Sequence, residues 1–391
     1  MKILIIGTRY APIPNVEGGA IETLITEYLG YVSKKKDLYV VYSAYSDRIN
    51  SSKLKIFDNV EFRYINTKSI MFKIMSFVVG ALRRLLNNPM IANYYAKLVV
   101  KDLEKRRELD KYDAVIIENE LSSIPYVKSK LSGKIISHIH NDYYNTSTPN
   151  INAIADACDE VWCVSKFILN RVKEIIKDKS KVKLLYNGIN LNSFNTNIDL
   201  KKQNNIKAKY NINKNDFVFL YTGRIMEAKG VLELVKAFNI ISKGKDNIKL
   251  LIVGGRLNNK KGKKYLKKVQ KEAKDNKNII FTGYVDYDKI SVFYSIASVQ
   301  VIPSLCEEAF GLIAVEGLIF GLPIIATNSG GLPEIIDSQK GILIENDNIV
   351  TNLVTSMEYY LNNKKKIIKN KTNVDFSIEK YNNTFYNLLH R

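Results

Sequence analysis

The sequence is poor in the residues that build metal clusters and disulfide frameworks. It contains only three cysteines and three histidines, and no two cysteines form a Cys-x-x-Cys pair. A zinc cluster or a disulfide-stapled secreted domain needs closely spaced cysteines or histidines, so both classes are disfavoured. We therefore expect reduced thiols in a cytoplasmic protein, with no metal site and no bound cofactor.

Long hydrophobic runs are also missing. The longest apolar run, residues 74–82, is about half the length of a membrane-spanning helix. The short apolar segment 3–6 ends in a turn signal at Gly7, and no signal-peptide cleavage pattern follows it. The sequence thus predicts neither a spanning helix nor a secretory leader.

Acidic residues are scarce relative to basic ones. Lysine and arginine number 59 against 39 aspartates and glutamates, which gives a formal net charge of +20. Such a charge favours phosphates, anionic lipid surfaces or nucleic acids as partners, although an excess of solvated lysines gives the same balance. The basic residues are dispersed and form no RNP-like or zinc-finger pattern, so we expect no nucleic-acid partner.

Apolar strands alternate with helical patterns through both halves of the chain. Predicted strands lie at 2–6, 38–42, 114–117, 134–137 and 160–164, and then at 217–221, 249–253, 279–281, 299–302 and 323–326. Continuous apolar strands separated by helices are typical of buried parallel sheets. The predicted fold class is therefore α/β, with two Rossmann-like domains that face each other across an interdomain cleft.

The domain limits follow from the polar stretches. The Asn-rich segment 187–213 is the natural linker, which predicts an N-terminal domain over 1–188 and a C-terminal domain over 189–372. Residues 373–391 are expected to form a helix that returns to the first domain. Since parallel sheets bind ligands at the carboxyl ends of their strands, the site is expected there, between the two halves.

The loop after the first strand contains Gly18 and Gly19, directly before a predicted helix. Glycines let backbone N–H groups approach a ligand closely, and a helix N-terminus favours anions. The dinucleotide-binding pattern G-x-G-x-x-G is not formed here, which disfavours a nicotinamide cofactor. A flexible turn without function is the alternative.

Two cations, Arg224 and Lys229, follow the strand that opens the second half. A guanidinium and an ammonium group between a strand and a helix can hold a diphosphate and neutralise the charge of a leaving group. In so basic a protein, two solvated side chains are the alternative.

Two glutamates after a later strand give the sharpest pattern. Glu308 and Glu316 flank Phe310, Gly311 and Leu312 in an otherwise apolar stretch. A helix that begins near Phe310 directs its first amides towards the region beside Glu308 and sets Glu316 about two turns further on. Charge in an apolar stretch is costly unless it is paired or used, which favours a functional role.

Together these motifs resemble those of the retaining glycosyltransferases of family 4, which have the GT-B fold. The resemblance covers nearly the whole chain and rests on Gly18-Gly19, Asn187-Gly188, Gly223-Arg224, Lys229-Gly230, Pro303-Ser304, the Glu308 to Glu316 segment and residues 330–334. It implies that the N-terminal domain binds the acceptor and that the C-terminal domain binds the nucleotide sugar.

The resemblance also implies roles for single residues. Arg224 and Lys229 would hold the donor diphosphate. Glu308 would contact the donor sugar as a catalytic residue, and Glu316 would bind the ribose hydroxyls. The remaining donor contacts would come from Gly18, Gly19, Val285, Phe310, Gly311 and Leu312, with the backbone of Val285 meeting the base. The doubled acid Glu307-Glu308 departs mildly from the family pattern, and Glu308 has the right spacing.

A histidine near the transferred sugar is implied as well. His140 follows the strand at 134–137, and the polar pair Asn141-Asp142 comes after it, as in the family. His138 follows the same strand, and alternation puts both histidines on one face, so the spacing leaves the choice open. His140 is preferred as the catalytic residue, with a structural histidine as the alternative.

The implied function is transfer of a sugar from a UDP- or GDP-linked donor to a hydroxyl of a glycan or lipid-linked acceptor, with retention and without a metal. Bacterial surface polysaccharide or glycolipid synthesis is the expected setting. A sugar-nucleotide epimerase or a glycoside phosphorylase of the same fold is the alternative, and a basic nucleic-acid-binding protein is a weaker one.

Residues 70–87 predict contact with a membrane surface. Lys73, Ser76, Gly80, Arg83 and Asn87 form a narrow polar stripe on a helix, with Arg84 beside it, and the other residues are apolar. Such a helix can lie in an anionic interface, which would make the enzyme peripheral on the inner face of the membrane. The alternative is that the helix packs into the N-terminal domain.

Overall fold

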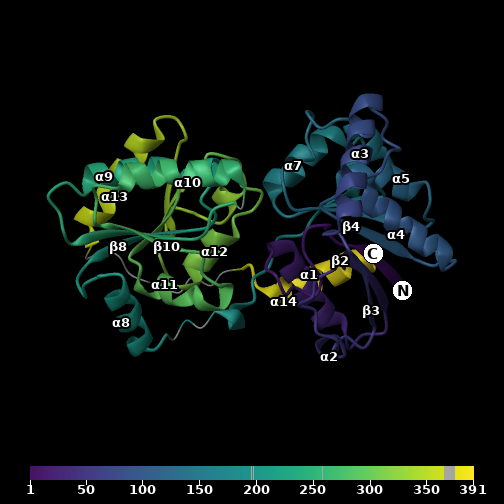
Figure 1. Ribbon diagram of the computed structural model, residues 1–391, viewed down its shortest axis with the longest axis horizontal. Coiled ribbons are helices and arrows are strands. Elements are labelled where there is room, and N and C mark those ends of the chain that lie inside the picture. The colour runs from purple at the N-terminus through teal and green to yellow at the C-terminus, as the bar shows by residue number, and fades with distance from the viewer. Residues whose placement is uncertain (195, 197, 258, 365–374) are drawn as a thin grey trace. The chain divides into compact units, whose positions relative to one another are not determined.

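The computed structural model describes residues 1–194, 196, 198–257, 259–364 and 375–391. It divides into two compact units (Figure 1): an N-terminal unit, Met1–Gly188 with Ile378–Arg391, and a C-terminal unit, Ile189–Ser377. Each unit is built around its own sheet. The predicted limit between residues 372 and 373 lies outside the described residues.

The N-terminal unit contains a seven-stranded sheet in the order β3-β2-β1-β4-β5-β6-β7, with every neighbouring pair parallel. The strands are β1 Lys2–Ile6, β2 Leu38–Ala44, β3 Val60–Ile65, β4 Ala114–Glu118, β5 Lys134–Ile139, β6 Glu160–Cys163 and β7 Val182–Leu184. Because all strands run the same way, the loops after β1, β4 and β5 meet at one edge.

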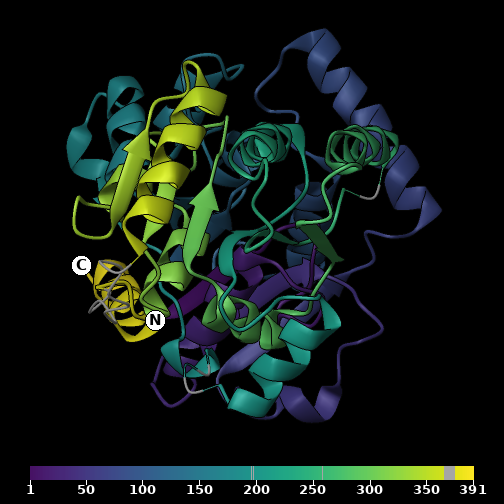
Figure 2. The same ribbon diagram turned by 90° about the vertical axis from the view of Figure 1, so that its left-hand side faces the viewer.

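The C-terminal unit contains a six-stranded sheet in the order β10-β9-β8-β11-β12-β13, again all parallel. The strands are β8 Phe217–Thr222, β9 Ile248–Val253, β10 Ile279–Gly283, β11 Val299–Ile302, β12 Ile324–Thr327 and β13 Gly341–Ile344. In Figure 1, α9, α10 and α13 cover one face of this sheet, and Figure 2 shows α13 lying over its strands. The loops after β8 and β11 are neighbours at its carboxyl edge.

Helices cover both sheets. In the N-terminal unit the helices are α1 Ala20–Val32, α2 Ser51–Leu54, α3 Ile70–Leu86, α4 Tyr94–Lys105, α5 Ile124–Lys128, α6 Ile151–Ala157, α7 Lys166–Ile175 and α14 Ile378–Leu389. In the C-terminal unit they are α8 Leu200–Lys209, α9 Val231–Ile241, α10 Lys260–Ala273, α11 Ser291–Ile296, α12 Leu312–Ile319 and α13 Ile349–Asn362. Within the described part of the chain, no helix has the length and apolar character needed to cross a bilayer.

The two predicted parallel sheets are confirmed, and the ten predicted strands all lie in them. The sequence pattern missed β3, β7 and β13, which lie at the sheet edges. Edge strands are only partly covered, so their sequences lack the continuous apolar run that marks a central strand.

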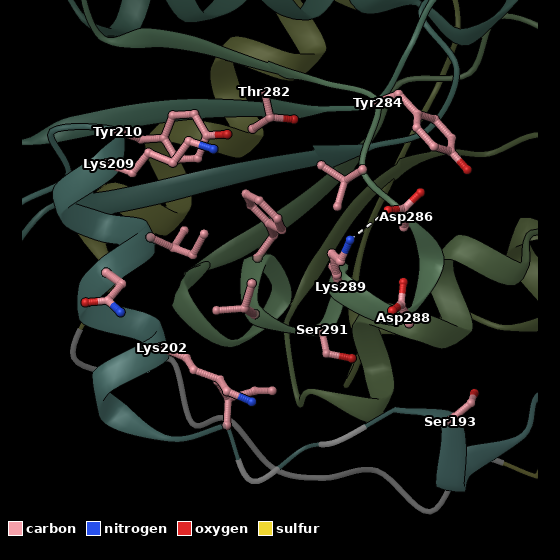
Figure 3. Close-up of a pocket in the computed structure, with 16 residues that line it drawn as sticks. Ser193, Lys202, Lys209, Tyr210, Thr282, Tyr284, Asp286, Asp288, Lys289 and Ser291 are labelled. Atoms are coloured by element: carbon pink, nitrogen blue, oxygen red, sulfur yellow. Dashed lines mark hydrogen bonds and ion pairs between the residues drawn. The ribbon is translucent and has the colours of Figure 1, made fainter.

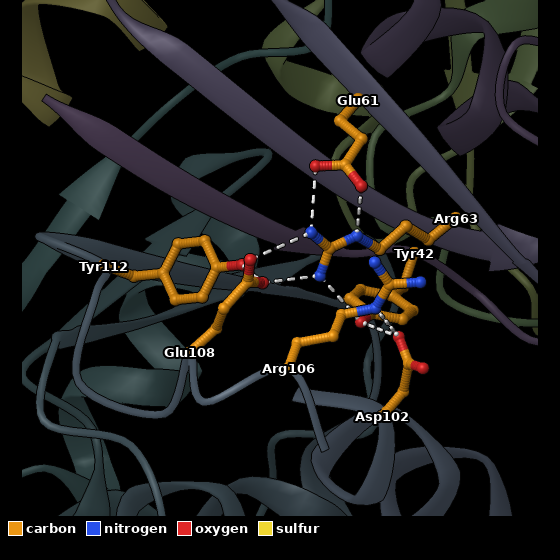
Figure 4. Close-up of polar contacts among 7 residues, drawn as sticks. All are labelled: Tyr42, Glu61, Arg63, Asp102, Arg106, Glu108 and Tyr112. Carbon is orange, nitrogen blue, oxygen red and sulfur yellow. Dashed lines mark hydrogen bonds and ion pairs between the residues drawn. The ribbon is translucent and has the colours of Figure 1, made fainter. Parts of the chain in front are cut away.

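A buried ion-pair network explains why β3 carries charge. Arg63 on β3 is almost fully buried, and its guanidinium contacts Glu61 at 2.7 Å and Glu108, beyond the end of α4, at 2.7 Å. Tyr42 on β2 accepts a further hydrogen bond from Arg63 at 3.0 Å (Figure 4). The Arg63 hydrogen bond holds the pKa of Glu108 well below its usual range. The network fastens the edge of the sheet to α4.

The predicted linker is partly wrong, because the segment 187–213 contains the helix α8. The Asp199 side chain accepts a hydrogen bond from the Lys201 amide and so caps this helix, and lysine, glutamine and alanine are good helix formers. Polarity misled the prediction, since none of the residues of α8 is buried.

The final helix α14 packs within the N-terminal unit, against α1. The rings of Tyr28 and Phe385 lie 3.7 Å apart between centroids, and Tyr381 and Phe385 are fully or almost fully buried. The helix therefore contributes to the core beneath β1, although it is distant in sequence.

Candidate active site

A charged pair joins two loops at the carboxyl edge of the C-terminal sheet. The Lys229 ammonium, after β8, contacts the Glu308 carboxylate, after β11, and Ser304 donates a hydrogen bond to the same carboxylate. Both charged side chains are mostly covered, with 19% and 14% exposed. The two residues that the family resemblance assigned to the diphosphate and the sugar therefore lie in direct contact.

Close backbone packing fixes these loops. Gly230 has a φ of 63°, and a Cβ atom there would lie 1.8 Å from the Pro303 carbonyl oxygen. Gly330, with a φ of 61°, would bring a Cβ atom within 2.1 Å of the Glu308 carbonyl oxygen. A side chain at either position would separate the loops, so glycine is required by space as well as by conformation.

Arg224 adds a second cation to this edge. Its side chain is exposed and forms no ion pair with a described carboxylate, while its carbonyl oxygen accepts a hydrogen bond from the Tyr221 hydroxyl at 2.8 Å. Burial raises the pKa of the nearby Cys306 thiol, and the charges of Lys229, Glu308 and Arg224 all act on it. The three predicted charged residues thus surround one thiol.

Glu316 lies buried on α12. The Tyr294 hydroxyl donates a hydrogen bond to its carboxylate at 2.6 Å and also contacts the Thr222 hydroxyl at 2.8 Å. Burial raises the pKa of Glu316 to about 7, although hydrogen bonds from Tyr294 and Tyr287 oppose this shift. A carboxylate of this kind can accept hydrogen bonds from a diol such as ribose.

The beginning of α12 agrees with the prediction. Gly311 precedes the helix with a φ of 113°, and Leu312 is its first residue. Phe310 is buried with its ring against Phe376, at 5.2 Å between centroids. The free amides of this first turn point away from the helix, and they can bind a phosphate or a sugar oxygen.

Val285 lies apart from the charged pair. It lines a pocket of about 660 Å³ between α8 and the segment 282–293, where Lys289 contacts Asp286 at 2.9 Å (Figure 3). Arg224, Lys229 and Glu308 do not line this pocket. Tyr287, two residues after Val285, hydrogen-bonds to Glu316, which links the predicted base and ribose positions.

The glycine loop of the N-terminal unit ends at α1. Gly18 and Gly19 are exposed and have φ angles of 88° and 129°. A Cβ atom on Gly19 would lie 2.2 Å from the buried Glu22 carboxylate, which also accepts a hydrogen bond from Thr8. Sequence reasoning did not identify Glu22, because an acid in the first turn of a helix is an ordinary feature.

The two histidines share one buried carboxylate, which the sequence analysis missed. His140 Nε2 lies 2.9 Å from Glu118 Oε2, and His138 Nδ1 lies 3.0 Å from the same oxygen. Glu118 is the last residue of β4 and is fully buried. The sequence signal for Glu118 is an acidic residue at the end of an apolar strand, β4, which pairs with the strand that leads to the two histidines, β5.

The positions of the two histidines differ. His138 lies inside β5, is fully buried, and faces the rings of Trp162 and Phe385, each 6.1 Å away between centroids. His140 lies beyond the end of β5, where its amide donates a hydrogen bond to Asn119 Oδ1 at 3.2 Å. The assignment of His140, rather than His138, as the catalytic residue stays a prediction.

The electrostatics of this cluster keep His140 neutral. Burial and the neighbouring His138 lower the pKa of His140 to about 4, although Glu118 opposes the shift. Burial alone would raise the pKa of Glu118, but the charge of His138 and the hydrogen bonds from both histidines lower it below its usual value. A neutral His140 that donates from Nε2 to Glu118 keeps Nδ1 as an acceptor.

The same three side chains satisfy the spacing of a metal site. One ligand atom from each of Glu118, His138 and His140 lies within 4.8 Å of the others, and no other described residues form such a group. The direct hydrogen bonds already account for the arrangement. The sequence-based expectation of a metal-free protein stays a prediction.

A second pocket, of about 750 Å³, lies at the carboxyl edge of the N-terminal sheet. Its walls come from the loops after β1, β4 and β5 and from the end of α3, with Arg9, Arg83, Asn119, Asn141 and Asn150 among them. Asn119 and Asn141 are direct neighbours of Glu118 and His140 in the sequence. The pocket therefore adjoins the histidine cluster.

Most of the C-terminal unit matches a known protein family. Residues 202–374 match the family model described as glycosyl transferases group 1. This segment contains the Lys229–Glu308 pair and Glu316, so the match falls on the unit that carries the charged site.

Two named relatives align with most of the chain. The lipopolysaccharide 1,2-N-acetylglucosaminetransferase of Salmonella typhimurium is 27% identical over 86% of this chain and 82% of its own. Spore coat protein SA of Bacillus subtilis is 24% identical over 89% of this chain and 86% of its own.

Solved structures share the fold. Anabaena Alr3699/HepE in complex with UDP and glucose has a TM-score of 0.74 with 16% identity, over 100% of this chain and 99% of that one. A glycosyltransferase from Rickettsia africae has a TM-score of 0.72 with 21% identity, over 99% and 97%. The predicted fold class of two Rossmann-like α/β domains is confirmed, and the matches support a glycosyltransferase of the hexosyltransferase type.

Proposed function

We propose that the protein is a retaining glycosyltransferase that transfers a sugar from a nucleoside-diphosphate donor to a hydroxyl of a glycan or lipid-linked acceptor. The observation that carries this proposal is the contact of Lys229 with Glu308, beside Arg224 and at the carboxyl edge of the group 1 domain. Bacterial surface polysaccharide or glycolipid synthesis is the setting, on the inner face of the membrane.

The charges give each residue a role. Breaking the glycosidic bond develops negative charge on the leaving diphosphate, which Arg224, Lys229 and the free amides at the start of α12 stabilise without a metal. Glu308, held by Lys229 and Ser304, contacts the donor sugar. Glu316 binds the ribose hydroxyls.

UDP is the favoured carrier. HepE was solved with UDP and glucose, and the Salmonella relative is named as an N-acetylglucosaminetransferase. The test is a thermal-shift series with UDP, GDP, UDP-glucose, UDP-N-acetylglucosamine and GDP-mannose, since a ligand that binds only the native state raises its stability. No shift with any of them would contradict the proposal.

The alternative enzyme classes are separated by the products. A transferase releases free nucleotide in proportion to glycosylated acceptor. An epimerase converts the donor alone into an isomeric nucleotide sugar, and a phosphorylase consumes inorganic phosphate. Either of these last two results would replace the proposed reaction.

We infer that α3 contacts an anionic membrane surface. Ile70, Met71, Phe77 and Leu85 are between 66% and 80% exposed, whereas Phe72 and Val79 are buried. Of the predicted polar stripe, Ser76, Gly80 and Arg83 are partly covered, whereas Lys73 and Asn87 are exposed. The exposure of most of these apolar side chains supports this proposal over the alternative of a helix packed into the N-terminal domain.

Charge favours a lipid partner for this surface. Residues 64–101 contain no acidic residue and six basic ones, namely Lys68, Lys73, Arg83, Arg84, Lys97 and Lys101. An exposed apolar patch marks an interaction site, and basic residues beside it are attracted to anionic headgroups by roughly 1 kcal/mol each.

A further inference from the structure

The pocket at the carboxyl edge of the N-terminal sheet is strongly basic. Arg9 follows β1, while Arg83 and Arg84 lie in the last turn of α3, and all three line the pocket. None of them forms an ion pair with a described carboxylate. The single acidic lining residue is Glu120, whose carboxylate accepts a hydrogen bond from Ser122 at 2.5 Å.

Local packing holds the arginines at this position. Asn87 ends α3 in the left-handed conformation, and the Asn150 side-chain amide donates a hydrogen bond to Asn87 Oδ1 at 3.0 Å. Arg9 is held on the opposite side, where its guanidinium lies over the Tyr10 ring at 5.1 Å and donates to the Tyr10 hydroxyl at 2.9 Å. Two separate segments thus contribute arginines to the lining of one pocket.

Three like charges around one pocket are unfavourable unless an anion joins them. Guanidinium groups bind phosphate oxygens with paired, charge-assisted hydrogen bonds, and they do so more strongly than they bind neutral sugars. The pocket volume of about 750 Å³ leaves room for a phosphate or diphosphate with part of a sugar.

We propose that this pocket binds the phosphate or diphosphate group of a lipid-linked acceptor, with Arg9, Arg83 and Arg84 as its ligands. The inference rests on the proposed function, because it names the acceptor class of the same enzyme. Asn119 and Asn141 line the pocket beside Glu118 and His140, so an acceptor anchored by its phosphate directs a sugar hydroxyl towards His140.

The lipid part has an adjoining surface. Leu82, Leu85 and Leu86, on the last turns of α3, are 45%, 80% and 60% exposed and flank the two arginines in sequence. A phosphate in the pocket therefore lies at the end of the apolar helix face. One helix contributes both the cations for the headgroup and the surface for the hydrocarbon chain.

The experiment measures binding of geranyl diphosphate, a soluble prenyl diphosphate, by calorimetry. Wild type should bind it, and Arg83→Ala/Arg84→Ala should bind it at least about tenfold more weakly, since a charged hydrogen bond is typically worth more than one factor of ten. Arg83→Lys/Arg84→Lys should recover part of the affinity. Lys111→Ala/Lys130→Ala removes two exposed cations of the same unit outside the pocket and should have no effect.

Further arms separate the sources of the anion. The affinity for inorganic diphosphate measures the contribution of the headgroup alone, and the affinity for geraniol measures that of the hydrocarbon chain alone. Tighter binding of geranyl diphosphate than of either probe supports a lipid-linked acceptor. Equal affinity for inorganic and geranyl diphosphate would overturn the lipid part. Unchanged binding in a folded Arg83→Ala/Arg84→Ala variant would overturn the phosphate site.

The donor site is tested separately, so that the two proposals can fail independently. Arg224→Ala should leave geranyl diphosphate binding intact, because Arg224 belongs to the C-terminal unit. Loss of binding in this variant alone would assign the anion to the donor site and overturn the inference. If no nucleotide binds but geranyl diphosphate does, the proposed donor chemistry fails and the anion pocket remains.

Discussion

At the scale of single residues, the contact between Lys229 and Glu308 explains why the cation cannot be treated as a solvated charge. Each side chain is mostly covered, and each would leave the other unpaired if it were removed. Truncating one partner of a covered pair therefore affects both the local structure and any ligand that the pair holds.

We expect Arg224→Ala and Lys229→Ala each to weaken nucleotide-diphosphate binding and to lower turnover. A charged contact to a phosphate is worth on the order of 1.5–3 kcal/mol, which corresponds to a loss of about tenfold to a hundredfold. Calorimetry with UDP and initial rates measure these losses. Normal affinity and turnover in both variants would refute the diphosphate assignment.

The neighbouring glutamates provide a matched pair. Glu308→Ala should remove most activity while the protein stays folded, because Glu308 contacts Lys229 and lies at the motif position. Glu307→Ala, at a more exposed position, should retain most of it. Circular dichroism and initial rates distinguish the two, and loss confined to position 307 would show that the register is wrong.

At the scale of elements, α3 reverses the usual arrangement of an amphipathic helix. Its inner face is partly polar and its outer face is apolar, whereas a helix on a globular surface normally buries its apolar side. Phe72 packs against Tyr94 at 5.6 Å between centroids, so a substitution there tests folding rather than membrane binding.

We therefore expect Phe77→Ser/Leu85→Ser to reduce binding to vesicles that contain anionic lipid, by at least about tenfold, because each side chain loses apolar surface that the interface would cover. Thermal stability should change little. Leu200→Ser/Ile240→Ser, at exposed apolar positions of the C-terminal unit, is the control and should bind as wild type does. Equal sedimentation of wild type and the α3 variant would exclude this helix as the anchor.

At the scale of the whole molecule, each unit carries a buried group whose pKa departs from its ordinary value, and the two shifts have opposite directions. Glu316 in the C-terminal unit has its pKa raised to about 7 by burial. His140 in the N-terminal unit has its pKa lowered to about 4 by burial and by His138. Each shift makes stability depend on pH, with opposite sign.

The signs follow from which state binds the proton. Between its ordinary value of 4.5 and about 7, Glu316 binds more protons in the folded state, so its contribution to stability is lost as pH rises. Between about 4 and 6.5, His140 binds more protons in the unfolded state, so stability is lost as pH falls.

We expect Glu316→Gln to gain stability relative to wild type as the pH rises from 4.5 to about 7. We expect His140→Gln to gain stability relative to wild type as the pH falls from 6.5 to about 4. Each effect is at most on the order of 3 kcal/mol. Unfolding midpoints of the three proteins from about pH 5 to pH 8 measure it. Parallel curves for a variant and wild type would remove that residue as the source of the dependence.

The sequence by itself determined the two parallel sheets, because continuous apolar runs of β-branched and aliphatic residues have no other stable place than the middle of a covered sheet. It also identified the segments that carry the four charged residues: Arg224, Lys229 and Glu308 lie in loops that follow such runs, and Glu316 lies on the helix that comes next. Their roles, like the predicted cleft between the domains, remain predictions.

Only the tertiary structure decided which distant residues meet. The pairing of Lys229 with Glu308, the sharing of Glu118 by His138 and His140, and the convergence of Arg9 with Arg83 and Arg84 all join segments separated in the chain. The sequence likewise did not decide that the apolar face of α3 is exposed. A helical pattern gives the width of an apolar or polar stripe, but it does not tell which side of the helix packs against the domain. Local sequence specifies the elements, whereas contacts between elements depend on how the whole sheet and its helices pack.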